Sequence, residues 1–198
     1  YVKKNKENDK YKPILRGKNI YKYGIKSVGE WVYYVPGIKV LTRGKSPDLF
    51  EVKEKILTQH VSSRIVATLD KDSYYYLQTI NGIVSKDTEI TNKYLLALLN
   101  SSLINYFYEF TFNMGAEFTT AVAIENLERI PIVKITEKEQ KPFIELVDRI
   151  LSITDNKDYL KNVDKQAMVK AYEKRIDKMV YELYELTPDD MHHRLAKE

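Results

Sequence analysis

The residue types that could support catalysis occur in this sequence, but their spacing does not match a catalytic site. Asp48, Glu51 and Lys53 are the types found in metal-dependent nucleases, where two acids hold a metal ion and a lysine lies beside the attacking water. Only two residues separate Asp48 from Glu51, too few to place the acids on paired strands. We therefore expect surface charge in a loop before a strand, and a nuclease is the weakest of three functional hypotheses.

Histidine and serine provide no stronger catalytic pattern. His192 and His193 are adjacent, so their side chains would diverge on a helix instead of sharing a metal ion, and His60 is alone in an expected strand. Ser101 and Ser102 lack the flanking glycines of a nucleophile elbow. The sequence also lacks a zinc-ligand spacing, a P-loop and a dinucleotide fingerprint. We therefore predict no catalytic residue, metal or cofactor in this chain.

The positive charge of the chain is concentrated in its first third. The 198 residues carry a net charge of +4, but residues 1–60 hold 14 Lys and Arg against 6 Asp and Glu. The rest of the chain has a small acidic excess. A basic face could attract a polyanion through phosphate contacts and counterion release, whereas the alternative is an ordinary solvated lysine-rich surface.

Several side chains in this basic region suit contacts with nucleic acid. Arginine can bind phosphate or a guanine edge with two hydrogen bonds, lysine supplies mobile charge, and glutamine can bind adenine. Tyrosine adds apolar contact together with a hydroxyl group. The predicted DNA-binding residues are Arg16, Lys18, Tyr21, Lys22, Lys26, Arg43, Lys45, Gln59 and Arg64.

Composition excludes several classes of protein. The chain has no cysteine, which excludes a disulfide scaffold and fits a reducing compartment. Its apolar runs stop far short of the roughly 20 residues that span a bilayer, so we expect a cytoplasmic protein with no membrane partner. The chain starts at Tyr1 instead of Met, and we expect it to be part of a longer polypeptide.

Short apolar runs rich in β-branched and aromatic residues predict strands in the first half of the chain. Gly, Pro, Asn or Asp interrupt the runs, and Asn81 with Gly82 predicts a turn. Residues 1–12 are polar and predict a linker or arm, so the folded part should begin near Pro13. The expected strands cover residues 30–35, 55–61, 64–69 and 74–79.

Helical periodicity begins near residue 92. Asn92 can cap a buried helix over residues 92–110, and Thr136 with Glu139 has the spacing of a capping box that starts a helix through Leu151. A long amphipathic helix is expected over residues 158–185, and Thr187 before a proline predicts a short terminal helix. The expected apolar stripe of the long helix is Leu160, Val163, Ala167, Tyr172, Ile176, Met179 or Val180, and Leu183.

Seven segments of the chain together carry a family resemblance. They are KPILRGKNI at 12–20, YGI at 23–25, EKILTQ at 54–59, IVATLD at 65–70, KYLLALLNS at 93–101, LERIPI at 127–132 and IDKMVYELYELT at 176–187. In this order they resemble the TaqI-like C-terminal specificity domain, the target-recognition domain of type II restriction-modification enzymes. In that family such segments follow an adenine-specific DNA methyltransferase.

The resemblance implies a DNA-binding part of a larger enzyme. The family's methyltransferase has a glycine-rich loop for S-adenosylmethionine and an NPPY-type motif, and this sequence has neither, so the catalytic domain is expected upstream. The specificity domain would close over double-stranded DNA and read its sequence while the methyltransferase extrudes the target adenine. Because they lie in segments that match the family, the resemblance implies that Arg16, Lys18 and Gln59 lie near DNA.

The predicted fold class is α+β, with a basic β-rich recognition part followed by a mainly helical C-terminal part. Residues 1–12 would be a linker or arm, residues 13–135 the β-rich recognition region with one buried helix, and residues 136–198 the helical region. The first functional hypothesis is sequence-specific duplex DNA recognition for a restriction-modification adenine-N6 methyltransferase or endonuclease. The alternative is a protein-interaction module that uses the C-terminal amphipathic helix.

Overall fold

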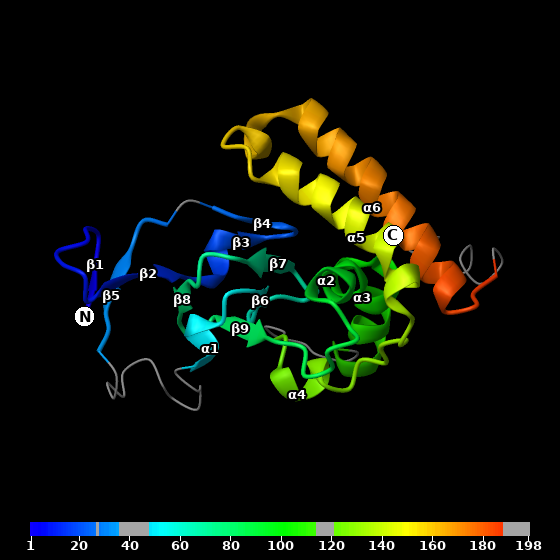
Figure 1. Cartoon of the computed structure of the whole chain (residues 1–198), viewed down its shortest axis with the longest axis horizontal. Coiled ribbons are helices and arrows are strands. Elements are labelled where there is room, and N and C mark those ends of the chain that lie inside the picture. The colour runs from blue at the N-terminus through cyan, green and yellow to red at the C-terminus, as the bar shows by residue number, and fades with distance from the viewer. Residues whose placement is uncertain (27, 36–47, 114–120, 188–198) are drawn as a thin grey trace.

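The structure, a computed structural model, describes residues 1–26, 28–35, 48–113 and 121–187. It confirms the α+β class: strands fill the N-terminal half of the chain and helices dominate the C-terminal half. In Figure 1 the strand-rich part lies on the left and the helices lie on the right. The described residues contain no helix with both the length and the apolar character needed to cross a membrane.

A four-stranded sheet forms the outer part of the β-rich half, in the order β1-β5-β2-β8. Strand β2 pairs antiparallel with β5 and parallel with β8. Residues 1–12, expected to be a linker or arm, contribute β1 and the beginning of β2 to this sheet, because Val2 pairs with Val32. The strands are β1 Val2–Lys3, β2 Tyr11–Leu15, β5 Trp31–Tyr33 and β8 Tyr75–Tyr76.

A three-stranded antiparallel sheet, in the order β7-β6-β9, lies between the first sheet and the helices. Asn81 and Gly82, expected to form a turn, instead lie within β9 and pair with Thr58 and Leu57. A Cβ atom on Gly82 would lie 1.9 Å from the Tyr76 hydroxyl, so close packing explains this glycine. The strands are β6 Lys55–Gln59, β7 Ala67–Asp70 and β9 Ile80–Ile83.

A small hairpin joins the β-rich half to the helices. Its strands are β3 Ile20–Tyr21 and β4 Gly24–Ile25, which pair antiparallel. Tyr23 adopts a φ of 60° in the turn, and its N–H donates to the carbonyl of Ala67 at 2.9 Å. The hairpin is therefore attached to the three-stranded sheet through β7.

The helix expected over residues 92–110 is broken into α2, Asn92–Asn100, and α3, Ser102–Tyr108. Ser101 is extended between them and accepts from the N–H of Ile104, so it caps α3. Thr91, instead of Asn92, caps α2. The following residues, Glu109–Asn113, form a π-helical turn, η2.

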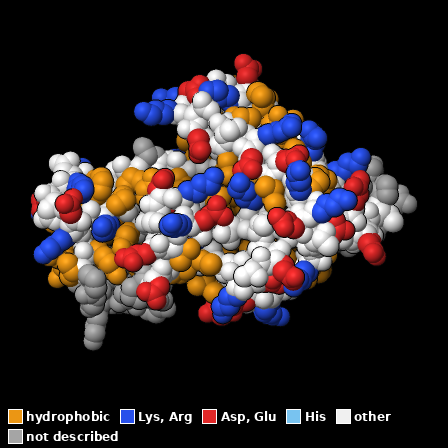
Figure 2. Space-filling view, viewed as in Figure 1, with side chains coloured by type: hydrophobic (Ala, Val, Ile, Leu, Met, Phe, Trp, Pro, Cys, Tyr) orange, Lys and Arg blue, Asp and Glu red, His pale blue; other side chains and the backbone are white. Residues whose placement is uncertain are grey.

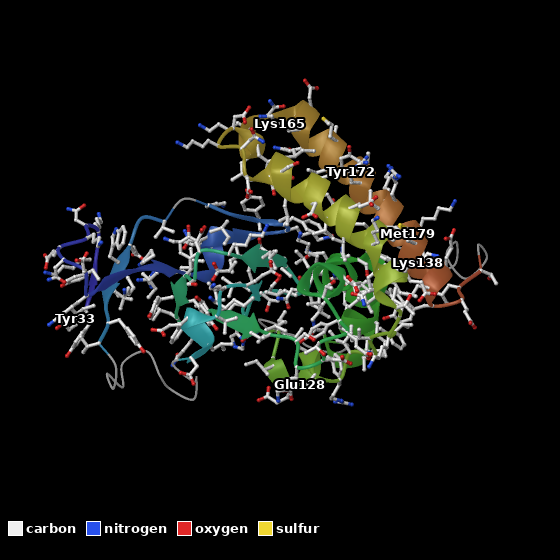
Figure 3. The ribbon with its side chains drawn as sticks, in the orientation of Figure 1. Tyr33, Glu128, Lys138, Lys165, Tyr172 and Met179 are labelled. Carbon is white, nitrogen blue, oxygen red and sulfur yellow. The ribbon has the colours of Figure 1, made fainter. Side chains whose placement is uncertain are left out.

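The C-terminal helices form an antiparallel pair. Helix α5, Glu137–Thr154, has the expected capping box of Thr136 and Glu139, and it packs against α6, Val163–Leu183. Figure 3 shows Lys138, near the start of α5, at the same end of the pair as Met179, near the end of α6. The short elements are α1 Asp48–Glu51, α4 Ile124–Leu127 and the 3-10 turns η1 Gly17–Asn19 and η3 Tyr159–Lys161.

The buried stripe of α6 differs from the expected one. Ile176 and Val180 are buried as expected and Val169 is buried as well, whereas Leu160 and Val163 are 46% and 77% exposed. The expected helix is interrupted because η3 precedes α6, and α6 reaches the core only after its first turn. The short helix expected after Thr187 lies outside the described residues, as do His192 and His193.

Two groups of buried apolar side chains form the core. The larger group connects β6 and β7 with helices α2, α3, α5 and α6, and the smaller group lies between the two larger sheets. Asn100 in α2 also bridges to the sheet, since its amide pairs with both the N–H and the carbonyl of Ala67 at 3.0 Å. The helices thus share a core with the three-stranded sheet, which also contributes to the smaller group against the four-stranded sheet.

Candidate nucleic-acid interface

The 3-10 turn η1 is held in one position by hydrogen bonds from neighbouring strands. The Gln59 side-chain amide donates to the carbonyls of Gly17 and Ile20 at 3.1 and 2.7 Å. The N–H of Gly17 donates to the Thr79 hydroxyl at 3.0 Å. These bonds come from β6 and from the connection between β8 and β9, so the three-stranded sheet positions the LRGKN segment.

Four basic residues lie in or near this turn. Arg16 donates a hydrogen bond to the Glu30 carboxylate and forms an ion pair with it. This hydrogen bond and the positive charges of Arg16, Lys18 and Lys4 lower the pKa of the Glu30 carboxyl below its usual value. Lys26 lies beside the turn because its N–H donates to the carbonyl of the last residue of η1 at 2.7 Å. The Glu30 carboxylate therefore interacts with three cations, Lys26 adds a fourth positive charge beside the turn, and the region keeps a positive surplus that can attract phosphate.

A tight turn between β8 and β9 lies directly against η1. The N–H of Ile80 donates to the carbonyl of Leu77 at 3.1 Å, which leaves Gln78 and Thr79 exposed between them. A Cβ atom on Gly17 would lie 3.0 Å from the Thr79 carbonyl oxygen, so the two loops touch at this glycine. We call these two loops and the four cations, Lys4, Arg16, Lys18 and Lys26, the η1 face.

The sequence did not reveal the part of this face that comes from the turn. Gln78 and Thr79 belong to a run of apolar and aromatic residues that predicts a strand through residue 79. In the structure, β8 ends at Tyr76. The sequence does not indicate this turn, because none of residues 77–80 is Gly, Pro, Asn or Asp, the residue types that are typical of turns.

Tyr21, predicted to bind DNA, packs against the helical part. Its hydroxyl donates to the carbonyl of Thr154 at 2.9 Å, and its ring stacks on Tyr159 with centroids 5.7 Å apart. Burial raises the pKa of the Tyr21 hydroxyl to about 12. The side chain therefore connects the β3–β4 hairpin to the end of α5.

Lys22, the next residue, also contacts the helices. Its Nζ donates to the carbonyl of Asn100 at 3.0 Å and lies 3.7 Å from Oε1 of Glu173. Burial raises the pKa of the Glu173 carboxyl, although Lys22 acts in the opposite direction. Tyr21 and Lys22 thus have structural contacts within the chain that the sequence did not predict.

Arg64 is the remaining predicted residue that the structure describes, and it contacts the helical part. Arg64 is an exposed residue that forms an ion pair with Glu109 in η2, with 3.6 Å between Nε and Oε2. Arg43 and Lys45 lie outside the described residues. Figure 2 shows basic and acidic side chains interspersed over the helical half of its visible face, in agreement with the small acidic excess of the sequence after residue 60.

The residues that suggested a nuclease do not assemble a metal site. Asp48 and Glu51 begin and end the short helix α1, where the sequence predicted a loop. Throughout the described part of the chain, no group of three or more His, Asp or Glu side chains is placed to hold a metal ion. His60 packs against the backbone, with Nδ1 3.1 Å from the Val122 carbonyl.

The fold and the family follow from comparison with known proteins. The structure is similar to that of the type IIL restriction-modification enzyme MmeI, solved in complex with DNA, with a TM-score of 0.64. The two are 15% identical, and the match covers 94% of this chain and 30% of that one. The sequence of residues 12–132, more than half of the chain, matches the family of the TaqI-like C-terminal specificity domain. This chain therefore belongs to the family of TaqI-like C-terminal specificity domains.

A curated relative agrees with this family. The chain is 31% identical over 140 residues to the "Putative type II restriction enzyme and methyltransferase RM.MjaORFECS2P" of Methanocaldococcus jannaschii. The match covers 65% of this chain but only 11% of the relative. The chain thus spans only a part of the length of each of these two proteins.

Proposed function

We propose that this chain recognises a DNA sequence in duplex DNA as the specificity domain of a restriction-modification enzyme. The observation that carries the proposal is the η1 face, where Lys4, Arg16 and Lys18 interact with one carboxylate and Lys26 adds a further positive charge, on a backbone fixed by the sheet. Membership of the specificity-domain family supports it. The catalytic domains would be an adenine-N6 methyltransferase, using S-adenosylmethionine, and an endonuclease in the same longer cytoplasmic protein.

The residues of the face would have two roles. Lys4, Lys18 and Lys26 are exposed and would contact phosphates, which sets the position of the domain on the duplex. Gln59 would act on DNA only through η1, because both hydrogen bonds of its amide nitrogen go to backbone carbonyls of the chain. Arg43, Lys45 and Arg64 would add contacts beyond the face.

The experiment that tests this proposal measures duplex retention across a salt series. The double variant K18A/K26A removes two exposed cations from the η1 face, and K138A/K141A removes two exposed cations from α5 as a charge-matched control. Each lost phosphate contact lowers the slope of log affinity against log salt by about 1, so K18A/K26A should lower it by about 2. An unchanged slope, or an equal change in the control, would contradict the assignment of the face.

The interaction-module hypothesis has no support in the structure. It required an apolar face of the C-terminal helix that is open to a partner. Val169, Ile176 and Val180 are instead buried in the chain's own core. The chain itself thus covers this part of the apolar stripe, and the strongly exposed apolar residues Val163 and Met168 lie near the start of α6.

A further inference from the structure

We propose that Gln78 determines specificity by binding an adenine in the target sequence. The inference deepens the proposed function and rests on it, since it names the side chain that reads a base at the η1 face. The sequence suggested Gln59 for such a contact. The structure instead engages Gln59 and leaves Gln78 exposed on the adjacent turn.

The first argument concerns which side-chain amides around η1 already form hydrogen bonds within the chain. Reading adenine with two hydrogen bonds requires both the oxygen and the nitrogen of one amide. Gln59 donates from its nitrogen to two carbonyls, and the Asn19 oxygen accepts the N–H of Arg16 at 2.9 Å. Within the described residues, the Gln78 amide forms no hydrogen bond, so both of its groups are available to a ligand.

The second argument is the rigidity of the backbone that carries Gln78. The turn is closed by the hydrogen bond from Ile80 to Leu77, and the Thr79 carbonyl accepts the N–H of His60 at 2.9 Å. The strands on either side, β8 and the start of β9, are buried. A side chain on such a turn loses little backbone entropy when it binds, which favours selective recognition.

The third argument is that the turn carrying Gln78 lies next to the cations of the η1 face. The Thr79 hydroxyl accepts the N–H of Gly17, so Gln78 and Lys18 each neighbour a residue of this contact. Phosphate contacts position a protein on DNA, and single side chains read the edges of bases. Cations beside a side-chain amide that has no partner in the described chain provide both kinds of contact.

The test is selection from a pool of randomised duplexes by the unaltered chain, Q78A and K18A, followed by sequencing of the retained DNA. The unaltered chain should enrich a short motif. Q78A should lose the preference for one A·T pair in that motif by roughly 10- to 100-fold and keep the other positions. K18A should weaken retention of all sequences about equally. Thermal unfolding should show that Q78A remains folded, because the side chain is exposed.

The outcomes separate this inference from the proposed function. If Q78A enriches the same motif as strongly as the unaltered chain, Gln78 reads no base while the proposed function stands. Equal weakening of all positions by Q78A would mean a phosphate contact and would also overturn the inference. Retention by the unaltered chain without any enriched motif rejects base reading by Gln78. No retention at any salt concentration would reject the proposed function and this inference together.

Discussion

At the scale of single residues, the buried ion pair of Lys55 and Asp70 is the most constrained interaction in the described chain. Both side chains are fully buried, and Nζ lies 2.7 Å from Oδ2. Nζ also donates to the carbonyl of Phe50 at 3.1 Å, while the carboxylate accepts the N–H groups of Asp72 and Tyr74. The pair therefore fixes α1 on one side and the loop after β7 on the other.

Replacing Lys55 with methionine should destabilise the chain by about 3–5 kcal/mol, because Asp70 would remain as a buried charge without a partner. Chemical denaturation followed by circular dichroism measures this change. Lys53 is exposed and two residues away, so K53M is the matched control and should change stability by about 0.5 kcal/mol or less. A loss below about 1 kcal/mol in K55M would show that the pair contributes little.

The sequence predicted three of the cations of the η1 face, Arg16, Lys18 and Lys26, but neither Lys4 nor the contacts that position the turn. Lys18 and Lys26 are exposed, as the clustering of basic residues indicated, and this follows from the high cost of burying an unpaired charge. The inward bonds of Gln59 and Tyr21 depend on backbone carbonyls brought close by folding. No local pattern in the sequence contains that information.

At the scale of elements, local capping rules succeeded where tertiary packing did not compete with them. The capping box of Thr136 and Glu139 formed as expected, since it involves only residues close in sequence. Helical spacing continued past Ser101, yet the chain turns there because Asn100 must reach the edge of β7. The turn expected at Asn81 and Gly82 does not form, because both residues pair with strand β6, with Thr58 and Leu57 as their partners.

The break between α2 and α3 can be tested at its cap. Ser101 is buried, its hydroxyl donates to the Leu98 carbonyl at 2.7 Å, and it accepts the N–H of Ile104. Alanine at this position should cost about 1–2 kcal/mol, because a buried N–H loses its acceptor. Thermal unfolding measures the loss, and S152A on the exposed surface of α5 provides a serine control that should be nearly neutral. Equal stability of the two variants would show that the cap is dispensable.

At the scale of the whole molecule, the helical region and the β-rich region share a core. The boundary expected at residue 135 crosses it, because Phe143, Val147 and Ile150 of α5 pack with buried residues of α2 and α3. The β3–β4 hairpin adds a second connection, since the hydroxyl of Thr154 donates to the Tyr23 carbonyl at 2.6 Å. The sequence patterns predicted two regions of different composition, but buried side chains from both regions pack in one core.

A fragment of residues 1–135 should therefore fail to fold cooperatively. Eight buried apolar side chains of the described chain lie beyond residue 135. At about 1.5–3 kcal/mol each, their loss is comparable with the whole stability of a typical domain, about 5–15 kcal/mol. Near-ultraviolet circular dichroism and thermal melting should show no tertiary signal and no sharp transition for this fragment, while the full chain should show both. A sharp transition of the 1–135 fragment would instead establish it as an independent domain, and the recognition surface could then be studied without the helices.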